Sequence, residues 1–214
     1  DYEADVIIVG SGAGGMNAAL RLREAGLSVI LLEKLIYTGG TSRCAGFFVN
    51  LGGHRQANEV QWAWPSYPYD VDAIVEKLNS EFNQLTTDPE LLRAMVVEGP
   101  KCIDWMVDGL GIDWVSSSKE PSGIGSLYLS GSITKYNSIN INDGLFTLLT
   151  EKVKEAGAEI HTSTAVKSLV MDNGAVVGVK AEYNKKDVFY HGTKAVFLMA
   201  GGFEMNRAML RKYV

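Results

Sequence analysis

A cluster of glycines near the start of the chain has the spacing of a phosphate-binding turn. Gly10, Gly12 and Gly15 fit the pattern G-x-G-x-x-G and directly follow Val6–Val9, a short apolar run typical of a buried parallel strand. In this pattern the first glycine permits a tight turn, the second lets the backbone approach a pyrophosphate, and the third allows close packing of a helix on the strand. The other residues of the loop are Ser11, Ala13 and Gly14. The spacing therefore predicts a nucleotide bound at the start of a helix.

An acidic residue stands where a nucleotide ribose is expected. After the glycines a helical pattern runs to Gly26, a natural helix stop, and Ser28–Leu32 is a second buried strand that ends at Glu33. A carboxylate at this point can accept hydrogen bonds from both hydroxyls of an adenosine ribose, and it would repel the 2′-phosphate of NADP. We include the next residue, Lys34, in the predicted site. Up to this point the pattern suits NAD and FAD equally well.

A second glycine cluster follows the acid and favours the flavin nucleotide. Its residues are Gly39, Gly40, Thr41, Ser42, Ala45 and Gly46. Such a loop offers backbone N–H groups and hydroxyls that suit a pyrophosphate and a ribityl chain. A unit that binds NAD does not need a second loop directly after the acid. The plain alternative is a surface loop, since clusters of Gly, Ser and Thr commonly form loops.

The chain resembles the FAD-dependent oxidoreductases related to fumarate reductase, succinate dehydrogenase flavoprotein and 3-ketosteroid dehydrogenase. The resemblance lies in three stretches with matching order and spacing, VIIVGSGAGGMNAALRLREAGLSVILLEK, GGTSRCAG and VFLMAGGFEMN. It implies that Val166 lies by the adenine and uses its backbone. It also places Ala200, Gly201 and Gly202 in the cofactor site. FAD is the cofactor that the resemblance implies.

Some positions depart from the family's pattern. Ala200 stands where a threonine is frequent, and Phe47 and Phe48 replace common glycines. The surface that faces the flavin is therefore expected to be bulkier and more apolar. No histidine lies in the GGTSRCAG stretch, so we expect FAD to be held without a covalent bond.

The resemblance and the patterns together predict an α/β fold, a Rossmann-like FAD-binding domain with a parallel sheet and a small antiparallel β-meander. The expected helices are Val71–Leu85, Pro89–Asp108 and Asp143–Ala156. A strand begins at Ile160, turns lie at Asp172–Gly174 and Lys185–Lys186, and a core strand spans Val196–Ala200. We assign residues 1–214 to an incomplete FAD-binding domain with a helical and loop insertion at about 57–140. From the resemblance we expect the capping domain, the final FAD-binding segment and the whole C-terminal half of the family's fold to be absent from this chain.

The sequence does not single out a catalytic residue. The aromatic residues Trp62, Trp64, Tyr67 and Tyr69 read as loop packing, with the wall of a substrate cleft as the alternative. Tyr128 and Tyr136 have the chemistry to act on a substrate, but packing is the ordinary role of such side chains. The histidines His54, His161 and His191 are scattered and read as structural. We therefore leave the catalytic residues unassigned.

Composition excludes several classes of function. The net charge is −5, so a general attraction to nucleic acid is not expected. No apolar stretch is long enough to span a bilayer. Cys44 and Cys102 are far apart and resemble no metal site, and this sparse cysteine content favours a reducing, cytoplasmic setting. The chain begins with Asp1 rather than Met, which leaves export of a processed form open.

These observations predict the FAD-binding portion of an oxidoreductase. It would transfer a hydride between flavin N5 and a small-molecule carbon next to a carbonyl or carboxylate. The alternative is a non-catalytic module that binds FAD or NAD. The family's chains are much longer than this one, so we expect a complementary polypeptide that carries the C-terminal half of the fold.

Overall fold

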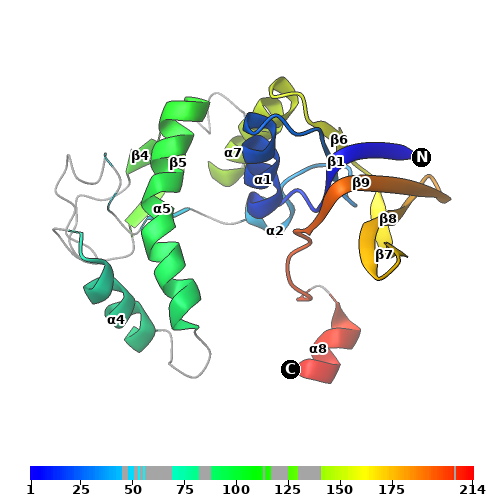
Figure 1. The fold of residues 1–214 in the computed structure, drawn as a ribbon. Helices are drawn as coiled ribbons and strands as arrows, with labels where there is room; N and C mark the ends of the chain where they lie inside the picture. The colour runs from blue at the N-terminus through cyan, green and yellow to red at the C-terminus, as the bar shows by residue number, and fades with distance from the viewer. Residues whose placement is uncertain are drawn as a thin grey trace. The chain divides into compact units, whose positions relative to one another are not determined.

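The computed structural model describes residues 1–44, 48–50, 53, 55, 69–81, 88–112, 114–116, 125–129, 141–204 and 206–214. The chain divides into two compact units, one formed by Asp1–Ala45 with Asn142–Val214 and the other by Gly46–Ile141. The first unit holds a six-stranded sheet in the order β6-β2-β1-β9-β8-β7 (Figure 1). The second holds a three-stranded sheet in the order β3-β5-β4.

The parallel part of the large sheet contains the first predicted strands. β1 (Tyr2–Val9) pairs in parallel with β2 (Val29–Leu32), and α1 (Ala13–Glu24) connects the two strands. β2 also pairs in parallel with β6 (Glu159–His161), which follows α7 (Ile141–Glu155). The central strands carry apolar side chains that are almost completely buried, namely Val6, Ile7, Ile8, Val29, Ile30, Leu31 and Leu32. Burial on both faces explains why these runs do not alternate with polar residues.

An antiparallel meander completes the sheet. It consists of β7 (Ala165–Asp172), β8 (Ala175–Tyr183) and the first part of β9 (Lys186–Leu198). β9 is long enough to serve both parts, since its residues from Lys186 to His191 pair antiparallel with β8 and those from Tyr190 onward pair in parallel with β1. The predicted α/β class, with a parallel sheet and a small meander, is confirmed. The predicted core strand Val196–Ala200 is the last part of β9, which ends earlier, at Leu198.

The two hairpin turns of the meander use left-handed backbone. Asn173 and Gly174 have φ of 46° and 83° and join β7 to β8, as predicted. The second turn lies at Asn184 and Lys185, with φ of 50° and 61°, one residue before the predicted position. Asparagine adopts this conformation more readily than other non-glycine residues, so Asn184 rather than Lys186 enters the turn.

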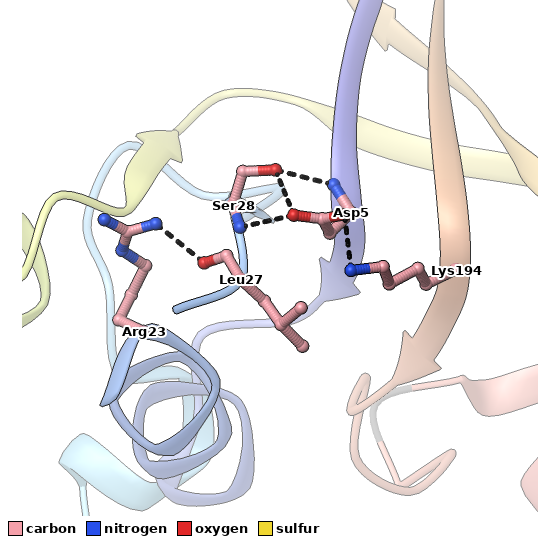
Figure 2. Close-up of polar contacts among 5 residues, drawn as sticks. All are labelled: Asp5, Arg23, Leu27, Ser28 and Lys194. Carbon is pink, nitrogen blue, oxygen red and sulfur yellow. Dashed lines mark hydrogen bonds and ion pairs between the residues drawn. The ribbon is translucent and has the colours of Figure 1, made fainter. Parts of the chain in front are cut away.

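A hydrogen-bonded ion pair fixes the amino ends of the parallel strands (Figure 2). Asp5 of β1 accepts hydrogen bonds at Oδ2 from the backbone N–H and the hydroxyl of Ser28, at 2.8 and 2.9 Å. Its own N–H donates to the Ser28 hydroxyl at 2.8 Å, and Lys194 Nζ of β9 lies 3.0 Å from its Oδ1. The bond from the Ser28 backbone, followed by Lys194, lowers the pKa of Asp5 to about 2. We call Asp5, Ser28 and Lys194 the amino-end cluster.

The second unit contains α4 (Val71–Glu81) and α5 (Pro89–Leu110), which pack through Ile74, Leu78, Leu92 and Val96. Pro100 lies inside α5 and has no N–H, so the carbonyl of Val96, four residues earlier, loses its helical partner. The hydroxyl of Tyr69 donates to this carbonyl at 2.7 Å, and burial raises the pKa of Tyr69 to about 12. Tyr69 therefore has the packing role that we expected for it.

The remaining strands and helices are short. β3 (Phe48–Asn50), β4 (Trp114–Ser116) and β5 (Gly125–Leu129) form the small antiparallel sheet. α2 (Gly40–Arg43) follows β2, and α8 (Arg207–Tyr213) follows β9. Tyr128 lies in β5 opposite Val115. Trp62, Trp64, Tyr67 and Tyr136 lie outside the described residues.

Candidate cofactor site

The first glycine loop joins β1 to α1, and its glycines meet different demands. Gly10 has φ of +103°, and a Cβ there would lie 2.4 Å from the carbonyl oxygen of Met199. A Cβ on Gly15 would lie 1.9 Å from the carbonyl oxygen of Gly10. A Cβ on Gly12 would meet nothing closer than the Ser42 hydroxyl at 3.5 Å, an ordinary contact. Packing within the chain thus requires glycine at positions 10 and 15, whereas the space beside Gly12 is open to a ligand.

The start of α1 is suited to an anion. Met16 N is the first amide that bonds back into the helix, to Gly12 O at 3.0 Å. Gly12 is the N-cap residue and offers no side chain to the helix amides, and the first turn has no acidic residue. N–H groups at such a helix start attract phosphate through hydrogen bonds and the helix dipole.

The second glycine loop is held by contacts that the sequence did not reveal. Gly39 has φ of +105°, and a Cβ there would lie 2.8 Å from Cβ of Arg43 and 3.0 Å from the ring of Phe146. Arg43 donates to Thr38 O at 3.1 Å and to the Thr147 hydroxyl at 3.2 Å. The loop therefore rests on α7, a helix more than a hundred residues later in the chain. Phe146 and Thr147 fall within the helix predicted at Asp143–Ala156, and no local sequence signal linked them to this loop.

The structure brings the two glycine loops together by direct hydrogen bonds. The N–H of Gly39 donates to both the carbonyl oxygen and the hydroxyl of Ser11, each at 3.0 Å. The N–H of Ala13, the first residue of α1, donates to the Ser42 hydroxyl at 3.2 Å. Gly40 and Thr41 stand in the same short helix α2. Ala45 and Gly46 lie outside the described residues.

Glu33 lies at the carboxyl end of β2 and only 5% of it is exposed. Its Oε2 accepts hydrogen bonds from the backbone N–H of Ser11 at 3.1 Å and from the Ser11 hydroxyl at 2.5 Å. Its Oε1 accepts from the N–H of Leu35 at 2.9 Å. The neighbouring Lys34 is exposed. The carboxylate is thus fixed beside the first glycine loop, where the sequence placed a ribose.

The connection from β6 to β7 runs alongside Glu33. The N–H of Thr164 donates to Glu33 O, and the N–H of Ser163 donates to Leu35 O, both at 2.8 Å. Val166 follows two residues later in β7, the edge strand of the sheet, and its side chain packs against the apolar core. An edge strand offers backbone groups on its free side. This position suits the backbone role that the resemblance implies for Val166.

The third glycine segment follows β9. Met199 N donates to Val9 O at 2.8 Å, so this segment leaves the sheet beside the first glycine loop. Ala200, Gly201 and Gly202 come next and are exposed, with φ of +77° at Gly201. The carboxyl ends of β1, β2 and β9 therefore present all three glycine-containing segments at one edge of the sheet.

The side chains of the described histidines bond outside this edge of the sheet, although the backbone carbonyl of His161 accepts a hydrogen bond from the Glu33 N–H at 2.9 Å. His161 bonds through Nδ1 to the Tyr190 hydroxyl at 2.9 Å and through Nε2 to Glu159 at 3.1 Å. Burial raises the pKa of Tyr190. His191 bonds to Glu3 at 3.0 Å. His54 lies outside the described residues, and neither Cys44 nor Cys102, both of which are described, is part of a disulfide. Within the described residues, no three His, Cys, Asp or Glu side chains are grouped to hold a metal ion.

The profile of the FAD binding domain family matches residues 5–214, which is nearly the whole chain. The chain belongs to the FAD binding domain family. Its cofactor is FAD, and the geometry fits this molecule. The open space at Gly12 and the start of α1 suit the pyrophosphate, and the Glu33 carboxylate lies beside them, where the sequence predicts the ribose.

Two curated relatives show how much of a flavoprotein this domain represents. The chain is 26% identical over 221 residues to NADH:fumarate oxidoreductase of Klebsiella pneumoniae, covering 98% of this chain and 21% of that protein. It is 30% identical over 220 residues to urocanate reductase of Eggerthella lenta, covering 99% of this chain and 34% of that protein. The chain therefore spans about a fifth to a third of the length of these relatives.

Solved structures share the fold. A 3-ketosteroid-Δ4-(5α)-dehydrogenase from Rhodococcus jostii superposes with a TM-score of 0.84 at 22% identity, over 100% of this chain and 49% of that one. A flavocytochrome c3 fumarate reductase superposes with a TM-score of 0.81 at 22% identity, over 100% of this chain and 36% of that one. The predicted resemblance is thus confirmed, and this chain carries only part of the fold of these proteins. Among the described residues no helix has the length and apolar character needed to cross a bilayer.

Proposed function

We propose that residues 1–214 are the FAD-binding portion of an oxidoreductase that reduces or forms a carbon–carbon double bond next to a carbonyl or carboxylate. The convergence of the three glycine-containing segments at the carboxyl ends of β1, β2 and β9 is the observation that carries this proposal. Bound FAD supplies hydride transfer at N5 of its flavin. The chain's own residues bind and orient the cofactor.

This proposal assigns tasks to the residues that line the three glycine-containing segments. The N–H groups at the start of α1, beside Gly12–Gly15, hold the pyrophosphate, and Glu33 accepts a ribose hydroxyl. Thr41 and Ser42 extend the polar wall toward the ribityl chain, and the backbone of Val166 meets the adenine. Ala200, Gly201 and Gly202 flank the cofactor from the end of β9. No residue of this chain is assigned to proton transfer.

The names of the relatives support the substrate class. They include reductases of fumarate, acrylate and urocanate. Each of these three compounds has a carbon–carbon double bond conjugated to a carboxylate. A small molecule of this kind is the proposed substrate.

The domain assignment and the partner also belong to this proposal. Residues 1–214 form one FAD-binding domain with an insertion at about 57–140, and a complementary polypeptide supplies the rest of the fold. Large apolar side chains near the cofactor edge are exposed in this chain, with Leu198 exposed by 61%, Ile36 by 80% and Tyr37 by 51%. Exposed apolar surface of this kind marks an interface. We expect more than roughly 2,000 Å² to be buried against the complementary part, as in a divided domain core.

Stopped-flow measurement of the full protein that carries this chain tests the reaction. We expect the bound flavin, once reduced by dithionite without oxygen, to be reoxidised by fumarate, acrylate or urocanate. Succinate, which lacks the double bond, is the matched control and should leave the flavin reduced. A flavin that binds but reacts with no conjugated acceptor and is not bleached by the saturated compounds would favour the non-catalytic module. Absence of flavin from the purified protein would contradict the cofactor assignment.

The mode of attachment has its own test. No histidine lies between Gly39 and Gly46, so we propose that FAD is bound without a covalent link. Acid precipitation should leave the yellow colour in the supernatant. Colour in the pellet, with a flavin mass added to a peptide, would contradict this.

A further inference from the structure

Ser11 carries the one polar side chain of the first glycine loop, Gly10–Gly15. None of its surface is exposed, although the sequence placed it among the residues that contact the cofactor. Its hydroxyl lies 2.5 Å from Glu33 Oε2 and 3.0 Å from the N–H of Gly39. A carboxylate only accepts hydrogen bonds and an N–H only donates, so the hydroxyl gives its proton to Glu33 and accepts from Gly39. The one donor of the hydroxyl and one of its two acceptor positions are therefore used within the chain.

These bonds determine what Glu33 has left for a ligand. A carboxylate has about four acceptor positions, two on each oxygen. Oε2 accepts from both the N–H and the hydroxyl of Ser11, and Oε1 accepts from the N–H of Leu35. Counting bonds to the described residues, one acceptor position remains, on Oε1. Ser11 therefore keeps Oε2 turned into the chain and leaves Oε1 as the oxygen that can meet a ribose hydroxyl.

The same hydroxyl links Glu33 to the second glycine loop. Gly39 is held at φ of +105°, against Arg43 and Phe146, so its N–H has a fixed direction. This N–H reaches the Ser11 hydroxyl, which in turn reaches the carboxylate. A displacement of the second loop is thus transmitted to the ribose-binding oxygen through one buried side chain.

We propose that Ser11 is a positioning residue for FAD, acting through Glu33 and not by touching the cofactor. The inference rests on the proposed role of Glu33 as the ribose acceptor. Without the hydroxyl, Oε2 loses the shorter of its two bonds, and only the N–H groups of Ser11 and Leu35 still hold the carboxylate in place. FAD affinity should then fall even though no cofactor contact has been removed.

The chain offers a matched control in Ser28. Its hydroxyl also donates to a carboxylate, Asp5 Oδ2, at 2.9 Å and accepts from a backbone N–H, that of Asp5, at 2.8 Å. It precedes β2, whereas Glu33 follows β2. Removing this hydroxyl changes a bond of the same kind at the other end of the same strand, away from the glycine loops.

The test is a double-mutant cycle on FAD affinity in the full protein that carries this chain. The FAD-free forms of the wild type, Ser11→Ala, Glu33→Ala, the double variant and Ser28→Ala are titrated with FAD and followed by quenching of flavin fluorescence. We expect Ser11→Ala to weaken FAD binding about tenfold, the loss of one charge-assisted hydrogen bond. Ser28→Ala should keep the wild-type affinity. In the Glu33→Ala background, Ser11→Ala should have no further effect, since the carboxylate that it positions is gone.

Each other result overturns the inference in a distinct way. Equal losses from Ser11→Ala in both backgrounds would show that Ser11 acts independently of Glu33. Wild-type affinity in Ser11→Ala, with a loss in Glu33→Ala, would remove the positioning role and leave the ribose role intact. Wild-type affinity in Glu33→Ala would overturn both. Thermal unfolding of each FAD-free form checks that it folds, and Ser11→Cys, which keeps a weak donor, should fall between the wild type and Ser11→Ala.

Discussion

Two serine–carboxylate pairs lie at opposite ends of β2, and they differ in what surrounds them. At the amino end Ser28 meets Asp5, whose side chain is 26% exposed and also meets Lys194. At the carboxyl end Ser11 meets Glu33, and both are almost completely buried between the two glycine loops. The Asp5 carboxylate has the cation of Lys194 beside it, and its described bonds are all to groups of the chain itself. The second is bonded only to neutral donors among the contacts described above and retains an acceptor position beside the start of α1, which is suited to an anion.

The comparison indicates that a hydrogen bond between a serine hydroxyl and a carboxylate beside a strand end does not in itself make a ligand site. What distinguishes Glu33 is the geometry of the adjoining loops, which depends on close approach of backbone to backbone. The two ends should therefore respond differently to substitution. Changes at the carboxyl end should alter FAD binding, and changes in the amino-end cluster should alter only stability.

The largest effect is expected at Gly15. A methyl group there would lie 1.9 Å from Gly10 O, so Gly15→Ala should force α1 away from β1. We expect a loss of about 3 kcal/mol in the free energy of unfolding of the FAD-free protein, the upper range for overpacking. Gly14→Ala is the matched control, because its new Cβ would meet only Met199 Sδ at 3.4 Å. Denaturant unfolding should show Gly14→Ala close to the wild type, and equal stabilities of the two variants would contradict the close-packing role.

The next effect is at Glu33. Glu33→Ala removes a charge-assisted acceptor from the ribose and should weaken FAD binding by about 2 kcal/mol. Asp5→Ala removes the corresponding carboxylate at the amino end and should leave FAD affinity unchanged. Isothermal titration of the FAD-free proteins measures both. Equal losses of FAD affinity in Glu33→Ala and Asp5→Ala would contradict the claim that the two ends of β2 differ in function.

Gly12 separates cofactor binding from folding within one loop. The Cβ of Gly12→Ala would meet the Ser42 hydroxyl at 3.5 Å and Gly39 O at 3.9 Å, so the chain itself accommodates it. The methyl group would occupy the space proposed for the pyrophosphate. We expect unchanged unfolding of the FAD-free protein and FAD binding weaker by about 1.4 kcal/mol, or tenfold. Unchanged FAD affinity would show that the pyrophosphate lies elsewhere.

Sequence alone predicted the β-strand, glycine turn, helix and second strand that end at Glu33, because the signals for these elements are local. One β-α-β unit contains Gly10, Gly12, Gly15 and Glu33. Each glycine is needed at its position for a backbone reason, so the spacing of the glycines is fixed and can be recognised in the sequence. The boundaries of β1 and α5 were predicted to within a few residues for the same reason, since apolar periodicity is read over short windows.

The contacts that complete the site were not predictable in this way. Arg43, Phe146 and Thr147 meet only in the folded chain, and the support of Glu33 by His161 and Thr164 depends on the pairing of β6 with β2. Ser11 was placed in the site for its position in the loop. Its complete burial, on which the proposed positioning role rests, is a property of the tertiary structure.

The smallest effect is expected in the amino-end cluster and depends on pH. The pKa of Asp5 falls from its ordinary value of 3.8 to about 2 in the folded chain, first through the Ser28 backbone N–H and then through Lys194. A lowered pKa means that folding favours the ionised form. Its contribution to stability is therefore complete above pH 3.8 and is lost as the pH falls toward about 2. Asp5→Asn has no charge to titrate, so the stability difference between it and the wild type should shrink over this window.

Urea unfolding of the wild type and Asp5→Asn at several pH values tests this. The difference should be modest at pH 6, because the cluster is exposed and its ion pair is screened. Added salt should remove only the share due to Lys194, since the hydrogen bonds from Ser28 are short-ranged. FAD affinity should stay at the wild-type value throughout. A difference that is constant from pH 6 to pH 2 would mean that the Asp5 carboxylate contributes nothing by its charge, and the amino-end cluster would then act through hydrogen-bond geometry alone.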